Sequence, residues 1–320
     1  MKVLLLVNPF SSSVTARTRV VIRKALAGDH DVELVETARR DHATRLARGA
    51  AADGVDVVVV LGGDGTVNEA ANGLAGSTTA LGVLPGGSTN VFARSIGLPN
   101  DPIEATADLL EAIEAGSIRR VGLGSANGRY FCFHVGMGYD AALVEQVEKR
   151  ASLKRWAGHP LFMYAGLTTF TRHFDRKHPH FAVTYPDGDG APNGYFAVCC
   201  NTNPYTFVGN RPFDIAPDAG LDRGLAMVTV ESLRADRFLR IMAKALAGKG
   251  ALQHDRWIHY RHDVASLVVE GIDGRPFPYQ LDGDYLGEID RIELRHEPDV
   301  LDLVLPVGFA DTASTPAPPP

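Results

Sequence analysis

A glycine-rich stretch that contains an acid and a threonine, LGGDGTVNEA, follows directly after an entirely apolar run, VDVVVV. Gly62, Gly63 and Gly65 have no Cβ, so they accept positive φ angles and let backbone N–H groups approach a ligand closely. Thr66 and Glu69 match the T-x-x-E pattern of a capping box, which predicts that a helix begins here. Clustered amides and the positive end of a helix together favour a phosphate group.

The acid within this stretch, Asp64, has two interpretations. A carboxylate is a poor direct neighbour for phosphate, but it suits a ligand hydroxyl or the Mg²⁺ of a nucleotide, because hard cations prefer carboxylate oxygen. In the second interpretation the stretch is a tight strand-to-helix turn, and the carboxylate caps a free amide. Glycine-rich turns are common, so this stretch alone leaves both interpretations open.

Two further polar loops follow apolar runs in the same way. The sequence GGSTN at residues 86–90 repeats the design, and Asn8-Pro9 followed by three serines ends the first apolar run. In an open parallel sheet, ligands bind beyond the carboxyl ends of the strands. Three such loops at one edge therefore favour a nucleotide site. It is not a P-loop, because the pattern G-x-x-x-x-G-K-[ST] does not occur.

A competing fingerprint, GMGYDA at residues 136–141, matches the G-x-G-x-x-A pattern of dinucleotide-binding proteins. Such a site would need a βαβ unit with an acid at the end of the next strand. The basic, helix-like run VEQVEKRASLKRW follows instead. We therefore interpret this motif as a close-packed turn.

The elements that must position the three loops alternate through the first 120 residues. Apolar runs such as KVLLLVN and VDVVVVLGG are separated by helix-like segments such as ARTRVVIRKALAG and PIEATADLLEAIEAG. Strands that are apolar on both faces and separated by helices predict a parallel sheet covered on each side. We expect an α/β nucleotide-binding domain at residues 1–120.

Beyond residue 120 the segments become short, with Gly, Pro and Asp turns between them, which predicts a mostly antiparallel β-sandwich or barrel at residues 121–299. One helix is expected at Ala235–Ala247. The strand at 300–306 could pair in either domain, and the tail at 310–320, rich in Pro, Ala and Thr, is expected to be disordered.

Composition limits the functional classes. The 320-residue chain has a net charge of −6, which argues against coating nucleic acid through a general positive field. Its three cysteines have no zinc or disulfide spacing, so we expect small apolar residues in strands and a cytoplasmic protein. The start, MKVLLLVNPF, is interpreted as a strand, not a signal peptide. No apolar run is long enough to span a bilayer.

The segment 149–177 is unusually basic and aromatic for this acidic chain. This composition suits peripheral docking to anionic headgroups at the inner face of the membrane. A helical hairpin that packs its aromatic rings into the second domain explains it equally well. We expect no nucleic-acid partner, because no recognised nucleic-acid-binding module accompanies the patch.

Taken together, GGDGTVNE, LPGGSTN, VGMGYDA and QLDGDYLG resemble, in order, the motifs of the diacylglycerol kinase catalytic-domain family of lipid kinases. That family is related to sphingosine kinases and more distantly to NAD kinases and phosphofructokinases. The resemblance implies an NAD kinase/phosphofructokinase-like α/β domain, a β-sandwich domain, and a cleft between them. It also implies ATP with Mg²⁺ as cofactors and a membrane lipid hydroxyl as acceptor, with diacylglycerol converted to phosphatidic acid.

The resemblance also implies roles for individual residues. Asp284 would be the general base, with Asp282 and Asp64 as further catalytic residues. The ATP-binding residues would be Asn8, Pro9, Thr37, Gly62, Gly63, Asp64, Gly65, Thr66, Val67, Asn68 and Thr89.

Two positions depart from the family pattern. Asp284 is one methylene shorter than the usual glutamate, so its reach must be made up by the backbone or by Tyr285. Arg223 replaces an aspartate that helps to hold a structural Mg²⁺ in many bacterial members, so we expect no metal there and an arginine–carboxylate contact instead. A soluble-substrate kinase of the NAD kinase type and a lapsed kinase that binds nucleotide remain alternatives.

Overall fold

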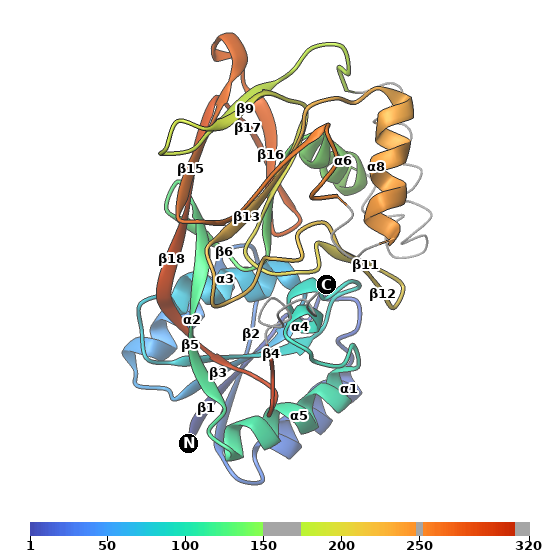
Figure 1. Cartoon of the computed structure of the whole chain (residues 1–320). Coiled ribbons are helices and arrows are strands. Elements are labelled where there is room, and N and C mark those ends of the chain that lie inside the picture. The colour runs from blue at the N-terminus through green and yellow to red at the C-terminus, as the bar shows by residue number, and fades with distance from the viewer. Residues whose placement is uncertain (150–173, 248–251, 311–320) are drawn as a thin grey trace. The chain divides into compact units, whose positions relative to one another are not determined.

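Parallel strands form the sheet of the N-terminal part of the chain. The computed structural model describes residues 1–149, 174–247 and 252–310 (Figure 1). Adjacent strands in the order β2-β1-β3-β4 pair in parallel. Their bounds are β1 Lys2–Val7, β2 Asp31–Glu36, β3 Val57–Gly62 and β4 Ala80–Pro85. The expected parallel α/β sheet is confirmed.

The burial of these strands follows their sequences. Every residue of β3 and β4 is buried, as expected for apolar runs with helices on both faces. The edge strand β2, DVELVE, contains no fully buried residue. The covering helices are α1 Ala16–Leu26, α2 His42–Ala52, α3 Asp64–Leu74, α4 Val91–Ser95 and α5 Pro102–Glu114.

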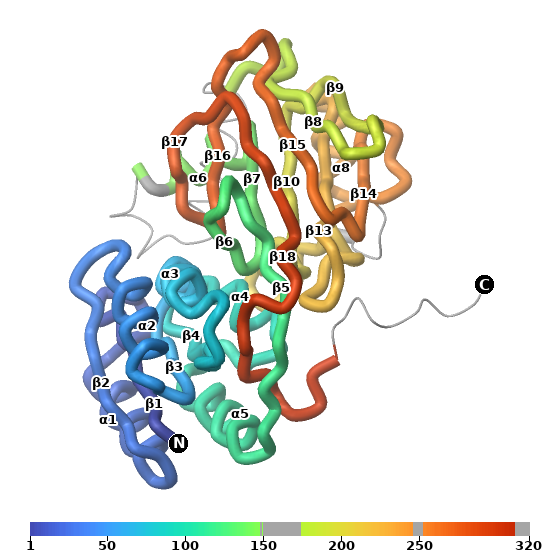
Figure 2. Tube along the Cα trace, turned by 90° about the vertical axis from the view of Figure 1, so that its left-hand side faces the viewer, coloured from blue at the N-terminus to red at the C-terminus, as the bar shows by residue number. Residues whose placement is uncertain are grey.

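The helices pack in pairs, α2 with α3 and α1 with α5 (Figures 1 and 2). Gly73 permits the close approach of α3 to α2, because a Cβ there would lie 2.5 Å from the carbonyl oxygen of Thr44. In each pair, one helix directly follows a polar or glycine loop: α1 follows the loop after β1, and α3 follows the loop after β3. The second helix of the pair packs against it. The loops at the strand ends are therefore held by the helices that follow them.

The chain divides into two compact units, one formed by Met1–Leu123 with the segment that begins at Glu297, the other by Gly124–His296. The long strand β18, Arg291–Val304, belongs to both. Its first residues pair antiparallel with β15, and Leu303 pairs in parallel with Leu81 of β4. The final apolar run, which sequence reasoning could not assign, thus joins the N-terminal sheet.

The second unit contains two antiparallel layers. One sheet has the order β14-β13-β10-β7-β16-β17, and in the other β15 lies between β18 and β8, with β9 paired to β8. Large side chains such as Phe131, Phe181, Phe277 and Leu294 form the fully buried core between these layers. The expected antiparallel β-sandwich is confirmed. The strands are β5 Ile118–Ala126, β6 Arg129–Phe131, β7 His134–Gly138, β8 Phe181–Thr184, β9 Gly190–Gly194, β10 Phe196–Cys200, β11 Thr206–Val208, β12 Arg211–Phe213, β13 Leu225–Val230, β14 Ile258–Val264, β15 Ser266–Gly271, β16 Phe277–Leu281 and β17 Asp284–Ile289.

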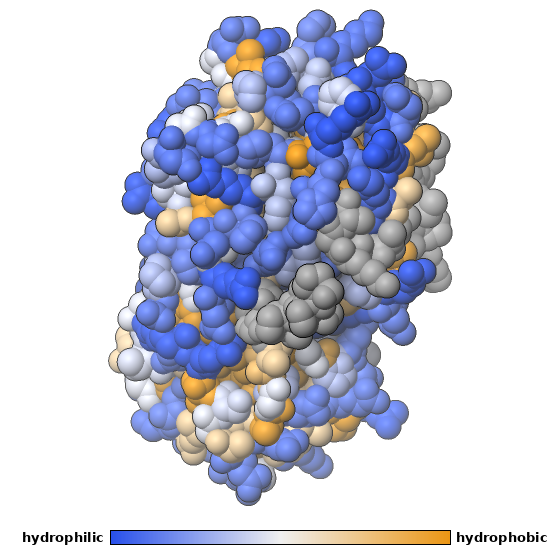
Figure 3. Space-filling model, viewed as in Figure 1, coloured by the Kyte–Doolittle hydropathy of each residue, from blue (hydrophilic) through white to orange (hydrophobic). Residues whose placement is uncertain are grey.

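The described residues of this unit also form two helices and a 3₁₀ turn. They are α6 Tyr139–Glu148, α8 Ala235–Ala247 and the 3₁₀ turn Ile272–Gly274. The position of α8 agrees with the helix expected there. All three cysteines are buried, as predicted; Cys199 and Cys200 lie in β10, whereas Cys132 lies between β6 and β7 and not in a strand. On the face of this unit that Figure 3 shows, hydrophilic residues cover most of the surface, since the apolar strand residues point inward.

Two expectations fall largely outside the described residues. The basic segment predicted to dock to membranes lies mainly within 150–173, and the tail predicted to be disordered lies almost wholly within 311–320. Among the helices that the structure does describe, none is long and apolar enough to cross a bilayer.

Candidate functional site

Three polar loops meet at the carboxyl ends of β1, β3 and β4, as the sequence predicted. The Asn8 side-chain amide donates a hydrogen bond to Thr66 Oγ1 over 2.9 Å. Ser11 Oγ accepts from the Gly63 backbone N–H over 3.3 Å, and Ser13 N–H donates to the Gly86 carbonyl over 2.9 Å. The first loop is therefore bonded to both glycine loops.

The two glycine pairs pack backbone against backbone. Gly86 N–H donates to the Gly62 carbonyl over 2.8 Å. A Cβ on Gly86 would lie 2.8 Å from Gly62 Cα, and one on Gly87 would lie 2.9 Å from Gly63 Cα. Real Cβ atoms do not approach backbone so closely, so residues 86 and 87 must be glycine for the loops to interlock.

Helix α3 begins earlier than predicted, and the expected capping box is wrong. The helix starts at Asp64 with Gly63 as N-cap, and no side chain caps this end. Thr66 instead accepts the Asn8 amide, and Glu69 Oε2 accepts the Ala43 N–H over 3.0 Å. Ala43 lies in the first turn of α2, so Glu69 caps a neighbouring helix instead of its own. The N-cap of α3 is thus a glycine, which has no side chain to cap the backbone amides that follow it.

Asp64 caps a neighbouring helix in the same manner. Its two carboxylate oxygens accept the Val91 and Phe92 N–H groups, each over 3.0 Å, at the start of α4. The side chain thereby ties the first glycine loop to the helix after the second. Burial lowers the pKa of Arg94 in this helix, and the negative charge of Asp64 opposes that shift. This geometry agrees with the capping interpretation of the acid.

Asn90 closes the second glycine loop, a role that sequence reasoning did not assign. It adopts a left-handed conformation with a φ of 50°. Its Oδ1 accepts the Gly87 N–H over 2.7 Å, and its Nδ2 donates to the Gly87 carbonyl over 2.9 Å. Thr89, the predicted ATP-binding residue, lies half-buried beside it.

A small pocket of about 210 Å³ lies beside the first glycine loop. Its lining residues are Asn8, Phe10, Thr37, Arg39, Arg40, Thr66 and Glu69. Three of these, Asn8, Thr37 and Thr66, were predicted to bind ATP. Arg39 and Arg40 were not, although their adjacent positive charges directly after the second strand were a usable signal. The positive charges of Arg39 and Arg40 would attract an anion to this pocket.

The remaining predicted ATP-binding residues differ in accessibility. Pro9, in the first loop, and Gly65, in the first turn of α3, are partly accessible. Val67 and Asn68 are each 2% exposed on α3, and Asn68 accepts from the side chain of Asn72. The side chains of Val67 and Asn68 thus face the interior, so direct contact of these side chains with a nucleotide is not supported.

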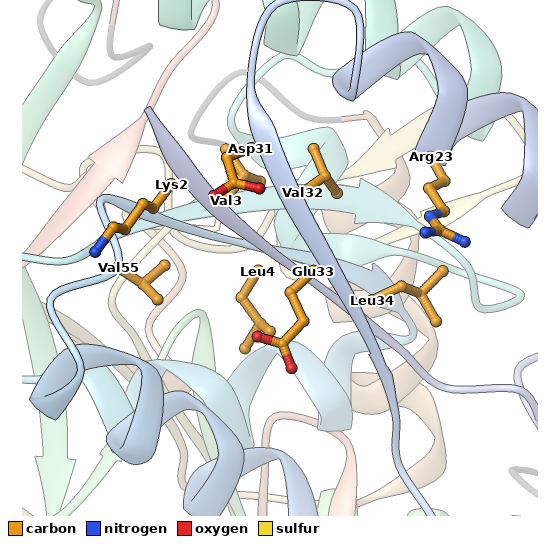
Figure 4. Close-up of a pocket in the computed structure, with 9 residues that line it drawn as sticks. All are labelled: Lys2, Val3, Leu4, Arg23, Asp31, Val32, Glu33, Leu34 and Val55. Carbon is orange, nitrogen blue, oxygen red and sulfur yellow. The ribbon is translucent and has the colours of Figure 1, made fainter.

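A larger cavity of about 490 Å³ lies along β1 and β2 (Figure 4). It is lined by residues that include Lys2, Asp31 and Glu33, with Arg23 of α1. Lys2 and Asp31 begin their strands, so the cavity lies away from the carboxyl ends at which ligands of such sheets bind. Its two acids also offset its two cations. We do not assign the nucleotide to it.

In the second unit, the predicted catalytic motif forms the hairpin between β16 and β17. Asp282 and Gly283 are the two loop residues, with φ angles of 48° and 83°. Positive φ at both central positions is the requirement of a type I′ turn, for which Asp-Gly is a preferred pair. Asp284 is the first residue of β17 and is half-buried.

Asp282 anchors this turn. Its carboxylate accepts backbone N–H groups from Cys132 over 2.6 Å, Phe133 over 2.9 Å and His134 over 3.0 Å. The residue is only 3% exposed. The sequence predicted a catalytic role for it, but the geometry shows a carboxylate held by three backbone donors. These bonds anchor the turn, and the catalytic role of Asp282 stays a prediction.

The motif GMGYDA contributes a buried polar cluster beneath the turn. Asp140 accepts hydrogen bonds from Tyr205 and, over 2.7 Å, from Gln280. Gln280 in turn accepts the Gly283 N–H over 2.8 Å. A Cβ on Gly136 would overlap Asp140, and Gly138 has a φ of 70°. The motif is a close-packed turn, as interpreted from the sequence.

Arg223 lies half-buried in a turn before β13, and its N–H donates to the Gly220 carbonyl over 3.2 Å. The arginine–carboxylate contact expected there is not found in the part of the chain that the structure describes. Within those same residues, no group of three or more His, Cys, Asp or Glu side chains is placed to hold a metal ion.

Comparisons with known proteins agree with the motifs. Residues 2–149 match the family model of the diacylglycerol kinase catalytic domain. The diacylglycerol kinase of Bacillus subtilis strain 168 is 28% identical over 273 residues, 83% of this chain and 84% of that protein. That of Mycobacterium tuberculosis H37Rv is 35% identical over 165 residues, 48% of this chain and 50% of that protein.

Solved structures extend the likeness over the whole fold. A diacylglycerol kinase structure from Bacillus anthracis strain Sterne has a TM-score of 0.70 at 21% identity, covering 97% of this chain and 98% of that one. A second from the same organism has a TM-score of 0.76 at 24% identity, covering 97% and 96%. At such identity these neighbours establish the fold.

The family resemblance seen in the motifs is thus confirmed for residues 2–149, which match the diacylglycerol kinase catalytic domain. The two curated relatives that the chain resembles are both named diacylglycerol kinase.

Proposed function

We propose that the protein is an ATP-dependent lipid kinase that phosphorylates the hydroxyl of diacylglycerol to give phosphatidic acid. The observation that carries the nucleotide half of this proposal is the uncapped N-terminus of α3, set between two interlocked glycine loops. The kinase names of the relatives support the reaction, and their acceptor supports the choice of diacylglycerol.

On the nucleotide side, the backbone amides that begin α3 would bind phosphate oxygens, aided by the positive end of the helix. Arg39 and Arg40 would add positive charge beside them. The pocket of about 210 Å³ is smaller than typical ligand pockets of roughly 300 Å³ or more, so it would hold only part of ATP. Asp64 would hold the two glycine loops at a fixed position relative to each other, so that both could contact the phosphates.

The residues of the site could hold Mg²⁺ only when ATP is bound, because the phosphates of ATP would supply most of its ligands. Mg²⁺ commonly binds through one or two carboxylates together with substrate phosphates, and it supplies charge neutralisation when bound. Asp64 is the acid in the glycine loop, but both its oxygens already accept amides. We therefore propose that the nucleotide phosphates are the principal ligands.

On the acceptor side, Asp284 would accept the proton of the lipid hydroxyl as the hydroxyl oxygen forms its bond to the γ-phosphorus and ADP leaves. Phosphoryl transfer needs positioning and charge stabilisation more than covalent help from the protein. The half-buried carboxylate of Asp284 begins a strand whose preceding turn is anchored by Asp282, so it has a defined place. Asp282 would serve as that anchor.

The test is phosphate transfer from labelled ATP to diacylglycerol in detergent micelles, with soluble alcohols, including NAD, as parallel acceptors. We expect label in phosphatidic acid only. Asp284→Asn should lower kcat by roughly 10²- to 10⁴-fold, the usual effect of a general base, and leave the calorimetric Kd of ATP unchanged. Asp273→Asn, which changes an exposed carboxylate in the same unit, is the matched control.

Two results would contradict the proposal. Label in NAD alone would indicate a soluble-substrate kinase, and ATP binding without transfer to any acceptor would indicate a lapsed kinase. A kcat for Asp284→Asn equal to that of the Asp273→Asn control would remove the base assignment while leaving the kinase intact.

A further inference from the structure

Gln280 lies at the centre of the hydrogen bonds beneath the catalytic turn. It is fully buried in β16, opposite Gly136 of β7 and Tyr285 of β17. Its Oε1 accepts the Gly283 N–H over 2.8 Å, and its Nε2 donates to Asp140 Oδ2 over 2.7 Å. A carboxamide can accept at one end and donate at the other in this way, whereas an ionised carboxylate can only accept.

The partner of Gln280 is itself fixed. Asp140, 2% exposed in the first turn of α6, also accepts the Tyr205 hydroxyl hydrogen. Burial raises the pKa of Asp140, and the hydrogen bonds from Tyr205 and Gln280 oppose that shift. The carboxylate is held by donors on both oxygens, so it gives Gln280 a single orientation.

The neighbouring strand leaves room for this arrangement. A Cβ on Gly136 would overlap Asp140 Oδ2 and would lie 2.5 Å from Gln280 Nε2. Glycine at this position, directly opposite Gln280 in the strand register, is therefore required by the pair and not by a ligand.

We propose that Gln280 is a positioning residue for Asp284 in the reaction proposed above, on which this inference rests. Its carboxamide fixes the Gly283 peptide, just as the Asp282 carboxylate fixes the preceding residue. With both turn residues held, the chain enters β17 along one path, and the Asp284 carboxylate is carried to one place. Loss of the Gln280 contact should then lower kcat without changing nucleotide affinity.

The chain offers a matched control in the same unit. Gln253 donates to Asp218, which also accepts the Tyr260 hydroxyl hydrogen over 2.7 Å. Gln253, Asp218 and Tyr260 thus form the same glutamine–aspartate–tyrosine arrangement as Gln280, Asp140 and Tyr205. Gln253 lies in the loop after α8, and Asp218 lies in a turn before β13. Among the contacts described, none of the three bonds to residues 282–284. Gln253 and Asp218 are half-buried. A loss of kcat that comes only from a disrupted glutamine–aspartate pair should appear at this pair as well.

The experiment compares three variants by kcat, by the calorimetric Kd of ATP and by the melting temperature. Gln280→Glu sets two carboxylates against each other. Asp140→Asn combined with Gln280→Glu exchanges carboxylate and carboxamide. It keeps the bonds from the Gly283 N–H and the Tyr205 hydroxyl, and it reverses donor and acceptor only between residues 140 and 280. Gln253→Glu creates the like-charge pair at the control position.

We expect Gln280→Glu to lower kcat by about tenfold or more, since misplacement by about 1 Å can cost roughly 10²-fold, with the Kd of ATP within about twofold. The double variant should recover most of kcat. Gln253→Glu should lower the melting temperature but keep kcat. If Gln280→Glu does not fold, Gln280→Met, which removes both bonds without adding charge, should show the same loss of kcat.

Retention of wild-type kcat in Gln280→Glu or Gln280→Met would overturn the inference. So would a double variant that regains the melting temperature but not kcat, or an equal loss of kcat in Gln253→Glu. Absence of phosphate transfer by the wild-type protein would instead overturn the proposed function, and the positioning role with it.

Discussion

At the scale of single residues, the two aspartates of the turn have opposite surroundings. Asp282 is buried and accepts three backbone amides, whereas Asp284 is half-buried at the start of a strand. The sequence predicted both as catalytic, because a motif names residues without showing where their side chains point. The distinction required the backbone donors of Cys132, Phe133 and His134, which lie about 150 residues earlier.

Asp282→Asn should therefore act on stability, unlike Asp284→Asn. The asparagine amide would set an N–H donor against backbone donors, and a buried unsatisfied donor costs about 1–3 kcal/mol. We expect the free energy of unfolding, measured by urea denaturation, to fall by that amount for Asp282→Asn. Asp284→Asn should change it by less than about 0.5 kcal/mol. Equal stability of the two variants would contradict the anchoring role.

At the scale of elements, sequence patterns predicted the strands and most helices, because apolar periodicity and glycine ends are local signals. They failed at the start of α3, where the capping box was expected. Thr66 and Glu69 have partners at Asn8 and Ala43, so their roles depend on tertiary contacts that no local pattern contains. Asp64 caps α4 for the same reason. Helices α2 and α4 are thus capped by side chains of α3, whereas α1 and α5 are capped by their own N-cap residues, Thr15 and Asp101.

The interlocked glycine loops give a prediction at this scale. Gly86→Ala would place a Cβ 2.8 Å from Gly62 Cα, so the loops must separate. We expect a loss of stability of about 1–3 kcal/mol, typical of overpacking, and a weaker calorimetric affinity for ATP.

Gly49→Ala is the control, since a Cβ there meets nothing within 4 Å in α2. It should stabilise the protein by up to about 1 kcal/mol through helix propensity and leave ATP affinity unchanged. If Gly86→Ala bound ATP as tightly as this control, the close approach of the loops would have no part in binding.

At the scale of the whole molecule, a buried histidine should make stability depend on pH. Burial lowers the pKa of His134 from its ordinary 6.5 to about 3, so the folded protein keeps it neutral. Between pH 6.5 and about pH 3, His134 binds a proton in the unfolded chain but not in the folded protein. The free energy of unfolding therefore falls as the pH falls below 6.5. The slope is at most about 1.4 kcal/mol per pH unit. The raised pKa of Asp140 acts in the opposite direction.

His134→Leu should flatten this dependence, because the opposing contribution of Asp140 is present in both proteins. Trp257 belongs to the unit Gly124–His296, so a change in its fluorescence reports unfolding of that unit. The free energy of unfolding should fall more steeply from pH 7 to pH 5 in the wild type than in the variant. Parallel curves would show that another group causes the dependence.

The pairing of Leu303 with Leu81 has a consequence for biosynthesis. β4 forms early on the ribosome, but the strand that covers its outer edge is translated more than two hundred residues later. Until then the nascent sheet has an unpaired hydrogen-bonding edge, of the kind that recruits foreign strands. A fragment that ends before β18 should keep this unpaired edge and therefore aggregate. Soluble expression of the N-terminal part alone should require residues 297–304 in the same chain, for example in a circular permutant.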